Sequence, residues 1–428
     1  MSSSMIGLVC IGLMLVMMAL RAPIALSMAA IGFFGFAWII AFDPAMAILE
    51  SGPFETLSNY SFSPIPMFIM MGVFASRAKM SDQLFSGART LFGAWRGGIA
   101  LSAILSCGIF SAISGSSVAT AASMSRVALP EMKKHGYADS LATGTLAAGG
   151  TLGIMIPPSI ALLLYALITE QSVGDMFIAG LIPGLLGLVL YCVTISIMVK
   201  WKPELATPGE ATNFKEKLVG LKGLIPFTGV FVIIIGGIYT GLFTPTEAAA
   251  IGAFATLVIA IVRGMNLEQF RESLQETLVT STMIFFMIIG AEIFGYFLSV
   301  SRISFELVSF VDSLHMTPFA ILISVLILFM LLGCVMDSIA MLLLTVPVVY
   351  PLIEAAGFDP VWFGIIAVIT VELGLITPPV GMNVFVIKAF APDISIGSIY
   401  KGVMPFVVSD IVRLALIIAF PILALGLV

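Results

Sequence analysis

The chain has 428 residues, enough for two or three soluble domains, yet 60% of them are hydrophobic, 10% are charged and the mean hydropathy is +1.15. So few charged side chains cannot cover a water-exposed surface of that size, which excludes a soluble fold. The net charge of −5 provides no basic face for phosphates, so nucleic acid is not expected as a partner.

The first apolar run, 5–20, has no basic residue before it, because the first Lys or Arg of the chain is Arg21. A secretory signal carries positive charge before its apolar segment, so this run is expected to persist as a membrane helix with its N-terminus outside. Similar runs follow and predict an all-α polytopic membrane protein. The expected crossings are 4–20, 24–42, 64–79, 138–169, 176–199, 224–241, 245–262, 280–299, 360–391 and 401–427.

Two further apolar segments, 97–131 and 317–352, are too long for one crossing. Small or polar residues interrupt each near its middle, at Ser114 to Ser117 and at Gly333 to Ser338. Each segment is predicted to enter the membrane, turn at mid-depth and leave on the same side. Such re-entrant hairpins require a backbone that faces protein or a wet cavity, since an unpaired peptide group is costly in hydrocarbon.

Basic residues predict the orientation. With five crossings in each half, nearly all loop Lys and Arg residues fall at one face, and Arg302 is the only clear loop cation opposite. The positive-inside rule places the basic face in the cytoplasm and both termini in the periplasm. The polar stretch 201–223 is then a cytoplasmic linker.

An offset of 221 residues aligns the two halves. It lays Ser338 on Ser117 and the Pro378-Pro379 pair on Pro157-Pro158, and the chain contains no other Pro-Pro dipeptide. Because five crossings per unit is an odd number, the halves are expected to form two inverted-topology repeats. The alternative is that small residues and prolines simply recur in any apolar bundle. The predicted division is a first repeat 1–200 (hairpin 97–131, broken helix 138–169), the linker 201–223, and a second repeat 224–428 (hairpin 317–352, broken helix 360–391).

Each Pro-Pro pair lies inside an apolar segment next to glycines, which predicts a helix broken in mid-membrane. A break exposes carbonyl oxygens, and beside a hairpin tip these can join Ser and Thr hydroxyls in replacing the water around a small hard cation. Half-helix N-termini would face an anionic group. The alternative is that the prolines only kink packed helices.

Two charged residues are interpreted separately. Asp337 lies at the second tip, where a carboxylate at mid-membrane depth is a functional candidate: it either ligates a cation or holds the hairpin turn. Arg126 either faces the cavity or extends its side chain to the cytoplasmic surface, and the second interpretation is favoured.

The chain resembles, over essentially its whole length, the large membrane (M) subunit of tripartite ATP-independent periplasmic (TRAP) transporters. The stretches that carry the resemblance are 110–122 (FSAISGSSVATAA), 130–137 (PEMKKHGY), 150–159 (GTLGIMIPPS), 336–340 (MDSIA) and 375–383 (LITPPVGMN). The resemblance implies sodium-coupled import of an organic acid, such as sialic acid or a C4-dicarboxylate, across the bacterial inner membrane. It also implies an elevator mechanism, in which hairpins and broken helices move against a fixed scaffold.

The resemblance further implies two protein partners besides membrane lipids: a small membrane subunit of about four helices and a periplasmic substrate-binding protein. No nucleotide-binding Gly-x-x-x-x-Gly-Lys-Ser/Thr motif occurs, in agreement with an ion gradient as energy source. The only expected cofactor is Na+, the coupling ion.

The resemblance also implies the site residues. The first sodium site should draw on Ser114, Gly115, Ser116 and Ser117, with Gly149, Thr151 and Gly153. The second should draw on Gly333, Val335 and Asp337, with Gly374, Thr377 and Pro378. Substrate should lie between the tips, near Ser116, Ser117, Asp337, Ser338 and Asn383.

Three alternatives differ in what they need. A stand-alone ion-coupled carboxylate transporter would work without a binding protein. A channel needs a continuous polar pore, whereas the intramembrane polar residues cluster at two tips and two breaks. An enzyme needs a catalytic set, and this chain has two distant histidines and no nucleophile-elbow motif, so no enzymatic activity is expected.

Overall fold

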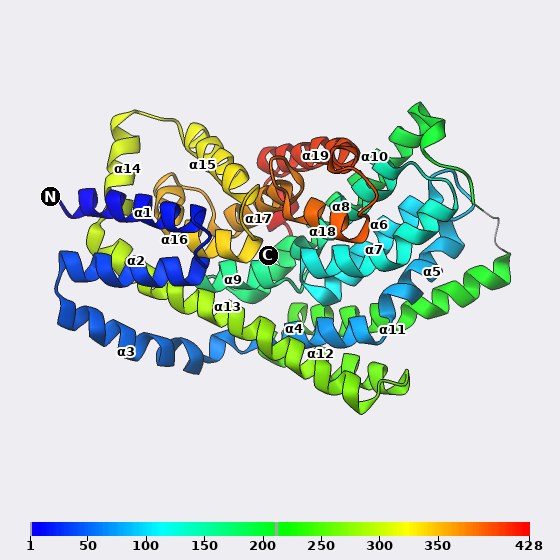
Figure 1. Ribbon diagram of the computed structural model, residues 1–428, viewed down its shortest axis with the longest axis horizontal. Coiled ribbons are helices and arrows are strands. Elements are labelled where there is room, and N and C mark those ends of the chain that lie inside the picture. The colour runs from blue at the N-terminus through cyan, green and yellow to red at the C-terminus, as the bar shows by residue number, and fades with distance from the viewer. Residues whose placement is uncertain (1, 210–212) are drawn as a thin grey trace.

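A computed structural model describes residues 2–209 and 213–428, with the backbone alone for residue 214. Residue 1 of the expected first repeat and residues 210–212 of the expected linker lie outside the described part. Within that part the chain is helical and contains no strand. The N-terminus lies at one end of the molecule and the C-terminus near its middle (Figure 1).

The helices of the first half are α1 (Ser3–Ala19), α2 (Ile24–Ile39), α3 (Phe42–Ser58), η1 (Tyr60–Phe62), α4 (Pro64–Arg77), α5 (Met80–Phe92), α6 (Gly98–Ser114), α7 (Ser117–Lys134), α8 (Asp139–Met155), α9 (Ile160–Ile168) and α10 (Val173–Trp201). After η2 (Pro203–Leu205) follow α11 (Phe214–Tyr239), α12 (Pro245–Val262), α13 (Leu267–Ser301), α14 (Ile303–Ser313), α15 (Pro318–Gly333), α16 (Ser338–Ala355), α17 (Pro360–Ile376), α18 (Met382–Phe390), α19 (Ile396–Ala419) and α20 (Ile422–Leu425).

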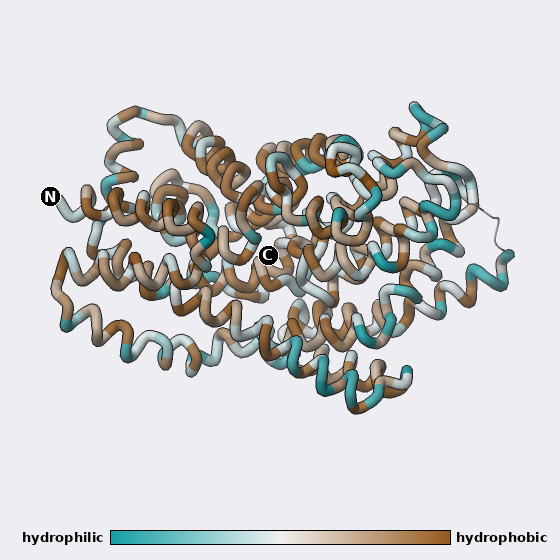
Figure 2. Tube along the Cα trace, viewed as in Figure 1, coloured by the Kyte–Doolittle hydropathy of each residue, from teal (hydrophilic) through white to brown (hydrophobic). Residues whose placement is uncertain are grey.

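Among the described residues, seven helical stretches are long and apolar enough to cross a membrane, with α8 and α9 counted as one. In α11 only 28% of the most apolar stretch is buried inside the protein, so its apolar side chains face outward, as in a helix that contacts lipid. The helices are mostly apolar in the middle of the molecule, and hydrophilic segments gather at the end where α11 begins (Figure 2). The chain is a multi-pass membrane protein.

Several helices differ from the sequence prediction. The segments 42–58 and 303–313 form α3 and α14, whereas the sequence predicts no membrane crossing or hairpin in either segment. The expected crossing 280–299 is part of the single 35-residue helix α13, because a capping box at Asn266 starts the helix early and no proline or glycine pair stops it at 280. Helix α11 begins at residue 214, inside the segment interpreted as a linker. Helix α4 has 14 residues and is therefore only about 21 Å long, short of a full crossing.

Helix bounds recur at the offset of 221 residues. Helices α7 and α16 begin and end 221 residues apart, and so do α8 and α17. The buried stretches also coincide, since every residue is buried from Leu141 to Met155 and from Trp362 to Ile376. These two helices therefore form the centre of the core, and the other helices surround them.

The central helix α8 packs closely against α19 through two glycines. A Cβ added to Gly144 would overlap the backbone of Gly402, and a Cβ added to Gly402 would overlap the carbonyl oxygen of Ser140. Any larger residue there would have to push the helix backbones apart. This contact joins the first half of the chain to the second.

A fully buried charged network ties four helices together further along α8 and α19. The Arg413 guanidinium on α19 pairs with Glu372 on α17 and lies 3.1 Å from Asp410 Oδ1. The Tyr191 hydroxyl on α10 donates to Asp410 Oδ2 at 2.6 Å and lies 3.1 Å from Thr151 Oγ1 on α8. Because an unpaired charge in this environment costs several kcal/mol, the network holds both central helices in one arrangement.

We expect Gly402→Ala to lower the thermal unfolding midpoint of the purified protein, because overpacking a tight helix contact costs about 1–3 kcal/mol. Gly397→Ala on the same helix is the matched control: nothing lies within 4 Å of its added Cβ, and alanine favours the helix. Tryptophan fluorescence during heating, in one detergent at one scan rate, measures both. Equal midpoints for the two variants would contradict the close packing of α8 and α19.

Candidate functional site

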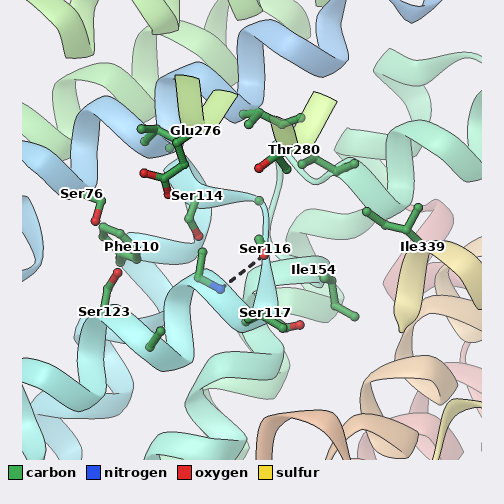
Figure 3. A pocket seen from close by; sticks show the side chains of 18 of the residues that line it. Ser76, Phe110, Ser114, Ser116, Ser117, Ser123, Ile154, Glu276, Thr280 and Ile339 are labelled. Atoms are coloured by element: carbon green, nitrogen blue, oxygen red, sulfur yellow. Dashed lines mark hydrogen bonds between the residues drawn. The ribbon is translucent and has the colours of Figure 1, made fainter. Parts of the chain in front are cut away.

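A cavity of about 690 Å³ lies where the tips of two helical hairpins face each other. One hairpin is α6 with α7, and the other is α15 with α16. Helices α4 and α13 form the opposite wall (Figure 3). Its polar and charged lining residues are Ser76, Arg77, Lys79, Ser114, Ser116, Ser117, Ser123, Arg126, Gln269, Glu276, Thr280, Asp337 and Ser338.

The first tip is a sharp turn of the backbone. Helix α6 ends at Ser114, and Gly115 follows with a φ of +58°, a conformation that glycine adopts without strain. Ser116 then caps α7, because its Oγ accepts a hydrogen bond from the Ala119 amide at 3.3 Å (Figure 3). Ser114 Oγ lies 2.7 Å from Thr120 Oγ1, so two hydroxyls meet beside the turn.

The second tip has a carboxylate where the first has a hydroxyl. Asp337 caps α16 and accepts a hydrogen bond from the Ile339 amide at 3.1 Å. Its position corresponds to Ser116 at the 221-residue offset, and both residues line the same cavity. The structure thus places Asp337 where it holds the turn and also faces the cavity, so the two roles weighed for it are compatible.

Both long helices that follow the hairpins are broken at their Pro-Pro pairs. Helix α8 ends at Met155 and α9 begins at Ile160; α17 ends at Ile376 and α18 begins at Met382. The Pro-Pro peptide bond is cis in each. The missing proline amides and the turns at Ser159 and Gly381 leave main-chain carbonyls without helical partners beside the hairpins.

Each break touches the tip of its own hairpin through a glycine. A Cβ on Gly153 would come within 2.5 Å of the Ser116 carbonyl oxygen, and a Cβ on Gly374 within 2.6 Å of the Gly333 carbonyl carbon. In the second half the Gly381 amide also donates to the Cys334 carbonyl at 3.0 Å. Only glycine permits this approach, which brings backbone oxygens from two elements together.

The first tip gathers hydroxyl and carbonyl oxygens, and the second adds the Asp337 carboxylate; hard cations prefer such oxygen ligands. Within the described residues no group of three or more His, Cys, Asp or Glu could hold a metal ion. Any cation at the tips would therefore be bound chiefly by neutral oxygens. That chemistry suits weak, reversible binding of an alkali ion as cargo.

The structure brings only some of the residues expected at the site to the cavity. Those that line it are Ser114, Gly115, Ser116, Ser117, Asp337 and Ser338. Gly153, Gly333 and Gly374 lie behind the tips, at the backbone contacts between hairpin and break.

Five other expected residues do not line the cavity, and their predicted role as sodium ligands stays a prediction. The Thr151 hydroxyl points to Ala148 and Tyr191, Thr377 Oγ1 donates to the Leu373 carbonyl, and the Val335 side chain is exposed. A Cβ on Gly149 would meet the Cys107 thiol, and Pro378 belongs to the chain between α17 and α18.

Asn383 is fully buried and does not line the cavity. Its Nδ2 donates to the Ala147 carbonyl at 3.2 Å, while its Oδ1 has no partner among the described residues. Because a Cβ on Gly150 would lie 3.1 Å from Nδ2, the amide fits tightly against α8. Asn383 therefore joins α18 to α8.

Several polar residues at the first tip and in the cavity are not among those predicted from the sequence. Buried Thr120, which contacts Ser114 behind the tip, lies one helical turn after Ser117, a spacing that could have identified it. Ser76, Glu276 and Thr280 come from α4 and α13, and no local pattern links them to the tips. Arg126 lines the cavity and its side chain is exposed, so the two interpretations of it are compatible.

Ion pairs fix the helices around the cavity mouth. Arg77 on α4 lies 2.9 Å from Glu272 and 3.3 Å from Glu276, both on α13. At the far end of α7, the Lys133 ammonium donates to Asp393 at 2.7 Å and lowers the pKa of that carboxyl. The wall of α4 and α13 and the hairpin with its neighbouring loop are thus fastened separately.

Comparison with known proteins agrees with this architecture. The family model described as tripartite ATP-independent periplasmic transporter, DctM component, matches residues 11–423. The C4-dicarboxylate TRAP transporter large permease protein DctM of Pseudomonas aeruginosa is 36% identical over 400 residues, which cover 93% of each chain. The sialic acid TRAP transporter large permease protein SiaM of Vibrio cholerae is 32% identical and covers 85% of each chain.

A solved structure shares the fold at low sequence identity. The Alcanivorax borkumensis YdaH transporter superimposes with a TM-score of 0.64 at 13% identity and covers 89% of this chain and 90% of that one. The relatives are permeases, and this chain is likewise not an enzyme. Since the family model spans nearly all of it, the chain belongs to the DctM component family, the large membrane subunits of tripartite ATP-independent periplasmic transporters.

Proposed function

We propose that the protein imports an organic acid across the bacterial inner membrane by sodium symport with an elevator movement. One observation carries the proposal: both hairpin tips, each in contact with a broken helix, face a single cavity. Oxygen donors at two tips provide two places for a small hard cation, and the cavity between them provides room for a carboxylate substrate. Sodium is then cargo that couples substrate entry to its own gradient.

An inverted repeat is supported by the placement of corresponding helices. Helices α5 and α14 correspond at the 221-residue offset, and they lie at opposite ends of the molecule (Figure 1). The first hairpin extends from the end where α11 begins, and the second from the end that carries the N-terminus. Two units of opposite direction can present the same tips to either side of a membrane.

The elevator movement is supported by the composition of the cavity walls. One wall is made of the two hairpins and the first broken helix, and it packs on the buried parts of α8 and α17. The other wall is α4 and α13, helices packed on α2 and α12. In this proposal the first group moves as one body against the second, and α5 and α14 connect the two. The basic residues Arg77 and Lys79 line the cavity, so it opens toward the cytoplasm in this state.

Substrate class and partners are proposed from the relatives. They are named for C4-dicarboxylate and sialic acid transport, so a carboxylate is the proposed substrate class. A small membrane subunit and a periplasmic binding protein would complete the transporter, and both termini would lie in the periplasm. A stand-alone carboxylate transporter is the second candidate, because the cavity by itself contains the donors for ion and substrate.

The protein is reconstituted in liposomes together with the proposed small membrane subunit and periplasmic binding protein. We expect uptake of labelled succinate or sialic acid only with an inward sodium gradient. Replacing sodium by potassium, or collapsing the gradient with an ionophore, is the control. Uptake without the binding protein would favour the stand-alone transporter. Sodium-independent leakage in both directions would favour a channel.

We expect Asp337→Ala to abolish sodium-dependent uptake. Asp337→Asn separates charge from capping, because asparagine caps a helix as well as aspartate does. It should keep the wild-type unfolding midpoint and yet need roughly tenfold more sodium for half-maximal uptake, about 1.4 kcal/mol of binding free energy, since a negative charge beside the cation is lost. Asp312→Asn, at an exposed position on α14, is the matched control. An unchanged sodium requirement in Asp337→Asn would remove the charge from the ion site.

Crosslinking across the cavity tests the movement. Ser76 on α4 and Ser123 on α7 both line it (Figure 3). In the variant Ser76→Cys with Ser123→Cys, a cleavable bifunctional thiosulfonate should stop uptake, because it joins a moving helix to a fixed one. Reduction cleaves the crosslink and should restore uptake. The two single variants treated alike are the controls. Full uptake by the crosslinked protein, verified by mass spectrometry, would reject the elevator.

A further inference from the structure

Arg126 provides an unpaired positive charge in the wall of the cavity. It lies on α7, and its guanidinium carbon is 5.5 Å from the centre of the Phe390 ring on α18. Within residues 2–209 and 213–428, no hydrogen bond or ion pair joins Arg126 to another residue. The other guanidinium of the lining, Arg77, is already paired with Glu272 and Glu276.

The contact with Phe390 leaves the hydrogen-bonding capacity of Arg126 free. A guanidinium that lies over an aromatic ring uses its flat face, so its N–H groups remain at the edge. Those N–H groups match a carboxylate in bidentate geometry, and such charge-assisted pairs are about twice as strong as neutral hydrogen bonds. The aromatic contact also restricts the side chain, which reduces the entropy lost when a ligand binds.

Ser123 adds a second donor on the same side of the helix. It precedes Arg126 by three residues, so the two side chains are neighbours on α7, and both line the cavity (Figure 3 labels Ser123). The acids of the lining do not neutralise this part of the wall: Glu276 pairs with Arg77, and Asp337 caps α16. The pair Arg126 and Ser123 therefore offers hydrogen-bond donors and one net positive charge.

The pair is separated from the tip. Arg126 follows Ser117 by nine residues, which is about 13.5 Å along the helix axis. An anion held chiefly by Arg126 and Ser123 would therefore lie further along α7 than one held at the tip, closer to the cytoplasmic end of the cavity in the proposed orientation.

We propose that Arg126 and Ser123 form a second subsite for the substrate carboxylate, which binds the acid after it leaves the hairpin tips. The subsite rests on the proposed function, since that function supplies the substrate. Because both residues belong to the hairpin, the subsite moves with it, whereas Arg77 and Lys79 stay with α4 and its connection to α5. The subsite lowers the chance that the acid returns to the tips before it reaches the cytoplasm.

The test measures the electrostatic potential at position 123 and does not depend on transport activity. In Ser123→Cys protein in nanodiscs, the reaction of Cys at that position with the anionic reagent 2-sulfonatoethyl methanethiosulfonate is compared with that of neutral methyl methanethiosulfonate, site by site by mass spectrometry. Adding Arg126→Gln should lower the anionic-to-neutral rate ratio about threefold to fivefold, because a unit charge a few ångströms away is lost. Arg126→Lys should retain most of the ratio. Lys134→Gln, a cation on α7 outside the cavity lining, should leave it unchanged.

Succinate then tests carboxylate binding directly. It should slow modification of the Cys at position 123 when Arg126 is present and have no effect in Arg126→Gln. A rate ratio that is unchanged by Arg126→Gln, or equal succinate protection in both proteins, would overturn the subsite. Loss of the proposed function would look different: the wild-type protein would fail to take up substrate on a sodium gradient while the Arg126-dependent ratio persisted.

Discussion

The main constraint on this structure is that peptide groups in hydrocarbon need hydrogen-bond partners. A helix that stops in mid-membrane leaves amides and carbonyls without partners, each at a cost of several kcal/mol. The protein meets this cost by burying α8 and α17, the two helices that break, from Leu141 to Met155 and from Trp362 to Ile376. Each break contacts a hairpin tip, and side chains satisfy part of the freed carbonyls: Ser159 donates to Ile154, and Tyr400 donates to Pro379 and Val380.

Burial of the broken helices in turn requires close packing and paired charge. Glycines 144 and 402 let α8 and α19 approach until only hydrogen fits between their backbones. Arg413 joins Glu372 and Asp410 in a network fully removed from water. Such a network contributes little net stability but strongly disfavours arrangements that separate its members. It joins α17 directly to α19, and it reaches α8 through Tyr191 of α10.

The hairpin tips combine structure and chemistry in the same residues. Ser116 and Asp337 cap the second arms of their hairpins and also line the cavity. A capping side chain is held in place by the amides it accepts from, so its position is set before any ion arrives. The opposite wall of α4 and α13 is fastened by its own ion pairs, independently of the hairpins.

The sequence alone determined the membrane class, the two hairpins, the two breaks and the family. These features follow from local chemistry. Long apolar runs predict membrane helices, small and polar residues interrupt two of them at 114–117 and 333–338, and the Pro-Pro pairs cannot continue a helix. It did not predict α3 and α14, since α3 mixes acidic and apolar residues, and α14 is too short for a periodic signal. Of the site residues it predicts, several at the hairpin tips line the cavity, and their roles in binding stay predictions.

Only the tertiary structure decided which side chains share the cavity. Thr151 and Asn383 lie in stretches that resemble the family's motifs, yet one points to Tyr191 and the other is buried against α8. Arg126 lines the cavity and also contacts Phe390 on α18, a residue 264 positions away in the sequence. Helix rotation and contacts between distant elements set these directions, and they depend on packing of the whole chain instead of on any window of sequence.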